Sequence, residues 1–154
     1  TYAMTGWRLG YGVMPKKMAD YLFTFCINNF SSTATYAQYA MIEALDGPQT
    51  EVDKMVKEFQ KRRDVIVDGL NSIKGIKCLK PEGAFYVFPN ITGTGLKSQQ
   101  FADKMLEEAG VAILSGTSFG KYGEGYVRFS YANSIENINE ALARIKKVLA
   151  TVKV

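Results

Sequence analysis

Two arginines lie in sequence contexts that suit the binding of an anion. Arg128 belongs to the segment YVRFSY, and the alternation of side chains along a strand places it on the less apolar of the two faces. A guanidinium in that position is either solvated on an edge strand or a receptor for a carboxylate, because it offers two parallel N–H donors. The strand pattern alone leaves both interpretations open.

The second arginine, Arg8, has glycines close to it on both sides. It follows Gly6-Trp7 and precedes Leu9-Gly10. Its side chain could stack on Trp7 as an ordinary strand residue, or the glycines could let an anionic ligand approach the backbone and meet the guanidinium. The residues themselves do not decide between these two interpretations.

Several other kinds of chemistry lack the residues they need. The sequence has no histidine, which excludes a Ser-His-Asp triad, a Cys-His pair and any histidine-containing metal site, so we expect no metal. The segment 115–125 is rich in glycine, but only three residues separate Gly116 from the following Gly-Lys pair. Tyr122 then follows Lys121, where a phosphate-binding P-loop has Ser or Thr. ATP binding through this loop is not expected.

Composition indicates a globular protein. The 154 residues are 47% apolar and 22% charged, which is ordinary for a chain with one hydrophobic core. The net charge of +4 is spread over separate predicted helices, which indicates a solvated surface and no nucleic-acid partner. No apolar run approaches the ~20 residues of a membrane-spanning helix, so no membrane partner is expected. The first residue is not Met and no signal segment follows, which predicts an internal or processed start.

The two cysteines, Cys26 and Cys78, have no short spacing that would suggest a disulfide or metal motif. Cys26 lies in an apolar segment of helical period, and Cys78 lies beside a predicted strand. We therefore expect two buried thiols in a reducing environment, and a cytoplasmic protein.

Hydrophobic periodicity predicts the secondary structure. Residues 2–14 are expected to form strand and loop, with Pro15 opening a helix that stops near Asn28. Residues 76–154 alternate strands with helices, which predicts an α+β sandwich. Further helices are expected at 35–45, 50–73, 101–109 and 135–152, the last capped by Asn133 or Ser134, and strands at 84–88, 111–114 and 126–131.

Five motifs, in order and along essentially the whole chain, resemble those of the aspartate aminotransferase superfamily, the class I/II or fold-type-I pyridoxal-phosphate enzymes. The motifs are TYAMTGWRLGY at 1–11, AQYA at 37–40, PEGAFY at 81–86, GTSFG at 116–120 with GEG at 123–125, and YVRFS at 126–130.

This resemblance implies an organisation of the chain. Residues 1–48 would be the C-terminal remnant of the large cofactor-binding domain, residues 49–75 the long helix between domains, and residues 76–154 the small C-terminal α+β domain. The segment 28–38 resembles one that lies at a dimer interface in the family, so a homodimer is implied. The remnant of the large domain would expose apolar faces unless a second copy or the rest of the protein covers them.

The resemblance also implies roles for the two arginines. Arg8 matches the arginine that binds the phosphate of pyridoxal phosphate, and Arg128 matches the arginine that binds the substrate α-carboxylate. The lysine that holds the cofactor as a Schiff base would stand immediately before Thr1, so no catalytic residue is expected in the chain. The chain alone is then expected to be inactive and to carry no covalently bound cofactor. The substrates implied are an amino acid, with aspartate as the first guess, and a 2-oxo acid.

Two alternatives remain open at this point. A related pyridoxal-phosphate lyase or synthase, or a regulatory aminotransferase-like domain, would keep both arginines. A non-catalytic α+β interaction module would merely have them solvated. Residues upstream of Thr1 would distinguish these cases, because the specificity and cofactor-binding residues are expected there.

Overall fold

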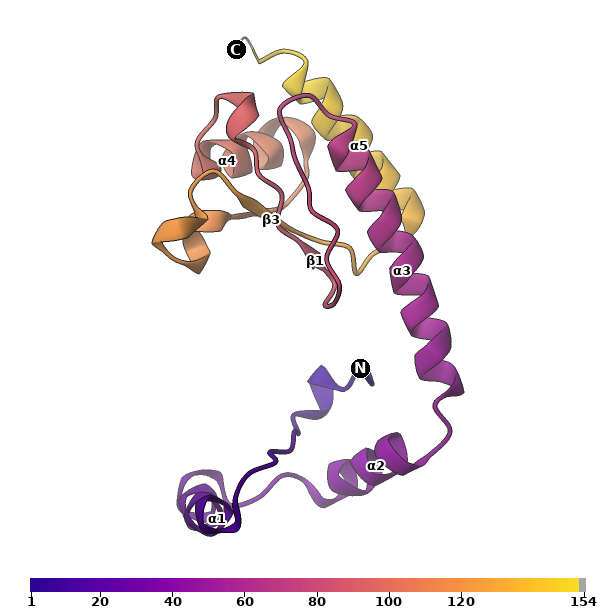
Figure 1. Ribbon diagram of the computed structural model, residues 1–154, viewed down its shortest axis with the longest axis vertical. Helices are drawn as coiled ribbons and strands as arrows, with labels where there is room; N and C mark the ends of the chain where they lie inside the picture. The colour runs from indigo at the N-terminus through magenta and orange to yellow at the C-terminus, as the bar shows by residue number, and fades with distance from the viewer. Residues whose placement is uncertain (153–154) are drawn as a thin grey trace. The chain divides into compact units, whose positions relative to one another are not determined.

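The computed structural model describes residues 1–152, and contacts within the chain divide it into two compact units. The first is Thr1–Met55 and the second begins at Val56. The division falls inside the helix α3 (Thr50–Asn71), which contributes to both units (Figure 1). Glu51 and Asp53 in the first turn of α3 suit the positive end of the helix dipole.

The first unit contains a short 3-10 turn, η1 (Thr5–Trp7), and the helices α1 (Lys16–Phe30) and α2 (Thr35–Asp46). Both helices were predicted within two residues of these bounds, and Pro15 sits one position earlier than expected, as the residue that precedes α1. The strand expected within residues 2–14 is wrong. A strand needs a neighbour to take its backbone hydrogen bonds, and no strand is present among residues 1–55.

The helices of the first unit leave most of their apolar side chains accessible. Ala37 is the one buried residue of helices α1 and α2, and α1 buries none of its side chains even though it carries Phe23 and Phe25. Cys26 is half-buried, so the prediction of a buried thiol is wrong for this cysteine.

The second unit is built on a small antiparallel sheet with the order β1-β3-β2. Its strands are β1 (Tyr86–Val87), β2 (Leu114–Ser115) and β3 (Val127–Ser130), each shorter than predicted. The prediction of a strand over 111–114 is wrong at its start, because Val111 still takes part in the hydrogen bonds that end the preceding helix. Its N–H donates to the carbonyl of Met105, and the preceding Gly110 adopts the left-handed conformation that ends helices.

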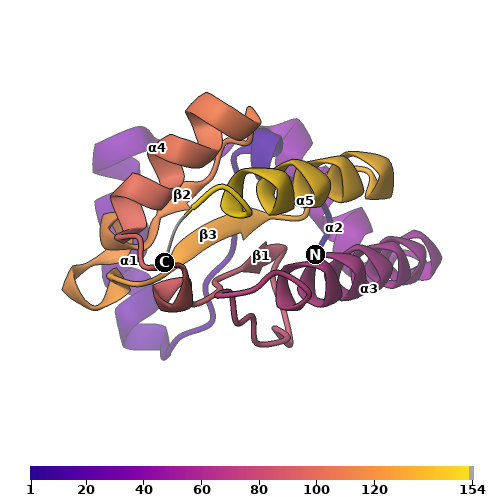
Figure 2. The same ribbon diagram turned by 90° about the horizontal axis from the view of Figure 1, so that it is seen from above.

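Two helices of this unit, α4 (Ser98–Ala109) and α5 (Ile135–Leu149), pack with α3 on one side of the sheet (Figures 1 and 2). The Ser134 hydroxyl accepts a hydrogen bond from the N–H of Asn137 at 3.2 Å, so Ser134 caps α5 as one of the two predicted alternatives. The mixture of helices with a small sheet confirms the predicted α+β fold. The core joins the sheet face of Val87, Val127 and Phe129 to Leu70, Phe101, Met105, Ile138 and Ile145 of the three helices.

The chain between α3 and β1 is held by side-chain hydrogen bonds. The Asn71 amide accepts from the N–H of Cys78 at 2.8 Å and donates to its carbonyl at 2.9 Å, which ties the last residue of α3 to this segment. The helix ends at Asn71, two residues before the predicted end at 73. Cys78 is buried as predicted, and burial raises the pKa of its thiol to about 11. No helix among residues 1–152 is long and apolar enough to cross a bilayer.

Candidate anion-binding site

Arg128 lies on the sheet face that the helices do not cover. Its strand neighbours Val127 and Phe129 are buried in the core, whereas Arg128 is half-buried, as the alternation in the sequence predicted. It occupies the central strand β3, directly opposite Leu114 of β2. A side chain in the middle of a sheet has its Cα held by pairing on both sides, so the strand fixes the origin of the guanidinium group.

Two aromatic rings fix the other end of the Arg128 side chain. Its Cζ atom lies 4.3 Å from the centre of the Tyr86 ring and 4.4 Å from the centre of the Phe119 ring. Both distances are well within the range of an attractive cation–π contact. Phe119 is in turn packed edge-on against Phe88, with ring centres 6.0 Å apart, and Phe88 stacks on Tyr126 at 5.4 Å.

Of the five arginines, three form ion pairs with carboxylates and two form none within residues 1–152. Arg62, Arg63 and Arg144 each form an ion pair with a carboxylate, at 3.0, 3.0 and 2.7 Å respectively. No ion pair within residues 1–152 involves Arg8 or Arg128, and the Arg128 guanidinium makes no hydrogen bond in that range. Arg128 is thus a partly desolvated cation with its N–H donors free, which suits an external anion.

The loop that carries Phe119 is tied closely to the start of α4. The buried Ser98 hydroxyl accepts from the N–H groups of Gly125 and Tyr126, at 2.8 and 3.1 Å, and donates to the Gly123 carbonyl at 3.3 Å. The Glu124 carboxylate accepts from the N–H of Ser98 at 2.9 Å and from that of Gly125 at 3.1 Å. These hydrogen bonds lower the pKa of Glu124 below its ordinary value of 4.5.

Glycines at two positions allow this loop to fold back on itself. A Cβ atom at Gly116 would meet the carbonyl oxygens of Gly123 and Tyr126, and a Cβ at Gly123 would meet the Gly116 carbonyl, at distances too short for any side chain. Both glycines are buried. Gly116 and Gly123 are therefore required by the close approach of the two backbone segments of this loop.

Arg8 belongs to the first unit and follows the η1 turn. Its backbone is left-handed, with φ 54° and ψ 46°, and its side-chain Nη1 donates to the Thr5 carbonyl at 3.0 Å. The side chain is exposed, and a Cβ atom built at Gly6 or Gly10 would have no heavy atom within 4 Å. Trp7 packs with Tyr36, at 6.3 Å between ring centres, and no cation–π contact joins it to Arg8 within the described residues. The other guanidinium N–H groups of Arg8 make no hydrogen bond within residues 1–152 and are available to an anion.

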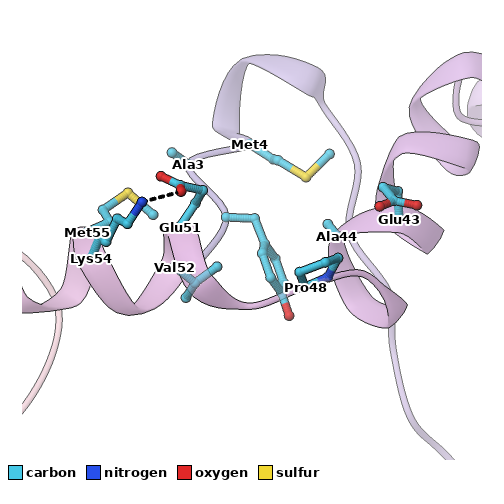
Figure 3. A pocket seen from close by; sticks show the side chains of 10 residues that line it. Ala3, Met4, Glu43, Ala44, Pro48, Glu51, Val52, Lys54 and Met55 are labelled. Carbon is cyan, nitrogen blue, oxygen red and sulfur yellow. Dashed lines mark hydrogen bonds and ion pairs between the residues drawn. The ribbon is translucent and has the colours of Figure 1, made fainter.

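A separate pocket of about 690 Å³ lies within the first unit, between the N-terminal segment and the α2–α3 connection (Figure 3). Its wall includes Met4, Pro48 and Val52, and at its edge the Lys54 amino group pairs with Glu51 at 2.7 Å. Both charged groups are largely exposed and already paired. Neither Arg8 nor Arg128 lines the pocket, so it adds nothing to the anion-binding chemistry.

The sequence pointed to both arginines but missed the residues that hold Arg128 in place. Tyr86 could have been found, because it and Arg128 both fall on the sheet face away from Val87 and Phe129. Phe119 carries no such signal, because it lies in a loop whose path depends on Gly116, Gly123 and the buried Ser98. The structure places Arg8 in the first unit and Arg128 in the second.

The fold and the motifs have clear relatives among known proteins. The family described as Aminotransferase class I and II matches residues 1–145. The aspartate aminotransferase of Pyrococcus horikoshii is 46% identical over 151 residues, which are 97% of this chain and 39% of that protein. The chain therefore belongs to the class I and II aminotransferase family.

Solved structures agree with this assignment. The aromatic aminotransferase from Pyrococcus horikoshii OT3 matches with a TM-score of 0.92 and 43% identity, over 96% of this chain and 40% of that one. The aspartate aminotransferase from Rhizobium meliloti matches with a TM-score of 0.93 and 36% identity, over 99% of this chain and 40% of that one. The chain thus spans about two fifths of the length of its relatives.

Proposed function

We propose that the full-length protein containing this chain is a pyridoxal-phosphate-dependent aminotransferase, which moves an amino group from an amino acid to a 2-oxo acid. Family membership supports the reaction class. The observation that carries the proposal is the state of Arg128: a half-buried guanidinium, stacked on two rings and without a carboxylate partner among residues 1–152. A purely structural arginine in such a place would be expected to pair with an acid, as Arg62 and Arg63 do.

In this proposal Arg128 binds the α-carboxylate that all amino acids and 2-oxo acids share. The guanidinium fork donates hydrogen bonds to both carboxylate oxygens and so fixes the orientation of the bond to Cα as well as its position. Loss of one charge-assisted bidentate contact costs on the order of 3 kcal/mol, or roughly a hundredfold in rate. Arg128 would thereby orient the substrate for removal of its Cα proton.

Arg8 would bind the cofactor phosphate. Its guanidinium donates to the Thr5 carbonyl through one nitrogen and keeps further N–H donors for an anion with several oxygen atoms. Pyridoxal phosphate, when bound, supplies an electron-accepting ring, and the protein supplies placement and charge. Arg8 anchors the end of the cofactor that takes no part in bond breaking.

We further infer that the lysine that binds the cofactor covalently lies outside residues 1–154, immediately before the position of Thr1. Lys121 does not suit the role, because its ammonium group lies over the exposed Tyr122 ring, 4.9 Å from the ring centre. Borohydride reduction of the full-length protein with pyridoxal phosphate, followed by peptide mapping, should find the label outside this chain. The isolated 154-residue polypeptide should take up no stoichiometric label and should not transaminate.

The organisation of the full-length protein follows from the same proposal. Residues 1–48 would complete the large cofactor-binding domain, residues 49–75 would connect the domains, and residues 76–154 would form the small domain. The exposed apolar side chains of α1 and α2 are then covered by the rest of the large domain and by the second subunit of a cytoplasmic homodimer.

The names of the relatives indicate which amino-group donors to test first. The relatives are named for aspartate and for aromatic amino acids, which share only the α-amino and α-carboxylate groups. We take aspartate, with 2-oxoglutarate as acceptor, as the first donor to be tested, followed by phenylalanine, tyrosine and alanine.

The experiment is a transamination assay of the purified full-length protein with pyridoxal phosphate and this panel of donors. Formation of glutamate from 2-oxoglutarate with at least one donor is the expected result. Release of ammonia or of the side chain without glutamate would instead identify a lyase. Absence of any cofactor binding would overturn the proposal in favour of a non-catalytic interaction module.

A further inference from the structure

The aromatic rings around Arg128 come from both neighbours of its strand. Tyr86 belongs to β1, which pairs with β3 on one side, and Phe119 follows β2, which pairs with β3 on the other. In the register of the sheet Tyr86 lies opposite Ser130, two residues along from Arg128. It is therefore a diagonal neighbour, within reach of a long side chain.

The two rings make the contact that a guanidinium prefers when no acid is present. The group is planar and weakly hydrated, so it stacks on aromatic faces while the N–H bonds at its edge remain available for hydrogen bonds. The distances of 4.3 and 4.4 Å place Cζ over both rings. Ion pairing to a protein carboxylate would have fixed the arginine equally well but would have used the donors that a substrate carboxylate needs.

Phe119 is itself supported from behind. Phe88 packs against it edge-on, Tyr126 stacks on Phe88 with an angle of 5° between their planes, and the loop of Phe119 is tied to Ser98 through Gly123 and Gly125. Phe119 is thus held on the side away from Arg128 by two further rings and by the hydrogen bonds of its own loop.

We infer that Tyr86 and Phe119 are positioning residues that hold the Arg128 guanidinium flat and preorganised for a carboxylate. This inference rests on the proposed carboxylate-binding role of Arg128. Preorganisation lowers the conformational entropy that the arginine loses when substrate binds, so the rings act on substrate affinity through Arg128. The aromatic face of each ring positions the guanidinium, and the hydroxyl of Tyr86 is not needed for this role.

The test compares variants that remove a ring with variants that keep one, in the full-length protein and with the best donor of the panel above. Tyr86→Leu and Phe119→Leu should each raise the KM for the donor by about 3- to 10-fold with a smaller change in kcat, as expected for the loss of one cation–π contact. Tyr86→Phe and Phe119→Tyr should restore the KM to within about 2-fold of the parent.

Tyr122→Leu is the matched control, because Tyr122 is an 86% exposed ring of the same loop that contacts Lys121 and not Arg128. It should leave the KM unchanged. In an Arg128→Gln background, Phe119→Leu should cause no further loss of kcat/KM, because the group that it positions is gone. Thermal unfolding of each variant checks that the protein remains folded.

The outcomes separate this inference from the proposed function. If Arg128→Gln leaves the KM of every donor unchanged, the carboxylate role of Arg128 is wrong, and the inference fails with it. If Arg128→Gln raises the KM but neither ring-removing variant does, only the positioning role is wrong. Equal effects of Phe119→Leu and Tyr122→Leu, or a Phe119→Leu effect that persists in the Arg128→Gln background, would likewise overturn the positioning role.

Discussion

The Ser98 hydroxyl accepts a hydrogen bond of 2.8 Å from the N–H of Gly125, 27 residues further along the chain. It thereby joins the first residue of α4 to the loop that leads into the Arg128 strand. The same oxygen contacts the Gly123 carbonyl and the Tyr126 N–H, and Ser98 is fully buried. One small side chain thus fixes both the loop that carries Phe119 and the start of β3.

Replacing this hydroxyl should loosen the loop. In Ser98→Ala the N–H groups of Gly125 and Tyr126 each retain a weaker alternative partner, at 3.1 and 3.2 Å, so we expect a cost of about 1–2 kcal/mol. Amide hydrogen exchange of segment 115–126 in the full-length protein should therefore become roughly 5- to 30-fold faster.

The control for this experiment is Ser72→Ala, which removes an exposed hydroxyl that donates to the Gly69 carbonyl, its one partner among residues 1–152. It should change exchange in segment 115–126 by less than a factor of about 2. Equal exchange in Ser98→Ala and the parent would mean that the loop is held by its glycines alone.

Glu124 gives the same loop a pH dependence. Its pKa is lowered because its carboxylate accepts from the N–H groups of Ser98 and Gly125, so the ionised form is favoured by folding. This stabilisation is fully present above the ordinary pKa of 4.5 and is lost as the pH falls through the lower value of the folded state. Glu124→Gln should therefore lower the Tm near neutral pH, and its difference from the parent should shrink below pH 4.5.

Measurement of Tm from about pH 3 to pH 7 for both proteins checks this expectation. Glu107→Gln is a suitable comparison, because Glu107 is exposed and forms no ion pair within residues 1–152. A difference between Glu124→Gln and the parent that stays constant across the whole pH range would show that the carboxylate charge is not what stabilises the loop.

Long periodic segments were predictable because their structure is set locally. The helices α1, α2, α4 and α5 follow from apolar spacing and from end signals such as Gly110 and Ser134, and both arginines stood out through their motifs. The strands were less predictable, because a strand of two residues is defined by its partner. Val111 illustrates this. Its N–H donates to the Met105 carbonyl at the end of α4, and the chain pairs with β3 only from Leu114. The contact of Phe119 with Arg128 could not be predicted from the sequence either, because it depends on how a glycine-rich loop folds back.

Arg8 offers a test of cofactor binding that does not depend on catalysis. Arg8→Gln removes a cation that has no carboxylate partner among residues 1–152, so we expect the Kd for pyridoxal phosphate to rise by about 10- to 100-fold. The left-handed backbone of Arg8 does not complicate the comparison, because glutamine and arginine have similar costs at φ 54°. Absorbance titration of the full-length apoprotein measures the Kd.

If Arg8 binds the phosphate, the loss of affinity in Arg8→Gln should be seen only with a ligand that carries the phosphate group. Pyridoxal, which lacks this group, should bind the parent and Arg8→Gln with similar affinity. Arg144→Gln removes an exposed arginine that pairs with Glu140 at 2.7 Å and should leave both affinities unchanged. Equal weakening of pyridoxal and pyridoxal phosphate would point to a structural defect and not to a lost phosphate contact.

The proposed carboxylate-binding role of Arg128 is tested by two variants, one that removes the positive charge and one that keeps the charge but changes the shape of the group. Arg128→Gln removes both the charge and the fork and should lower kcat/KM by roughly a hundredfold, whereas Arg128→Lys keeps the charge but loses the fork and the stacked plane. We expect the lysine variant to lose about tenfold, because a single ammonium cannot bind two carboxylate oxygens in fixed geometry. The matched variant Arg144→Lys should retain full activity, since its carboxylate partner lies on the surface of α5. A lysine variant as active as the parent would mean that positive charge alone suffices, and the rings of Tyr86 and Phe119 would then have no oriented group to hold.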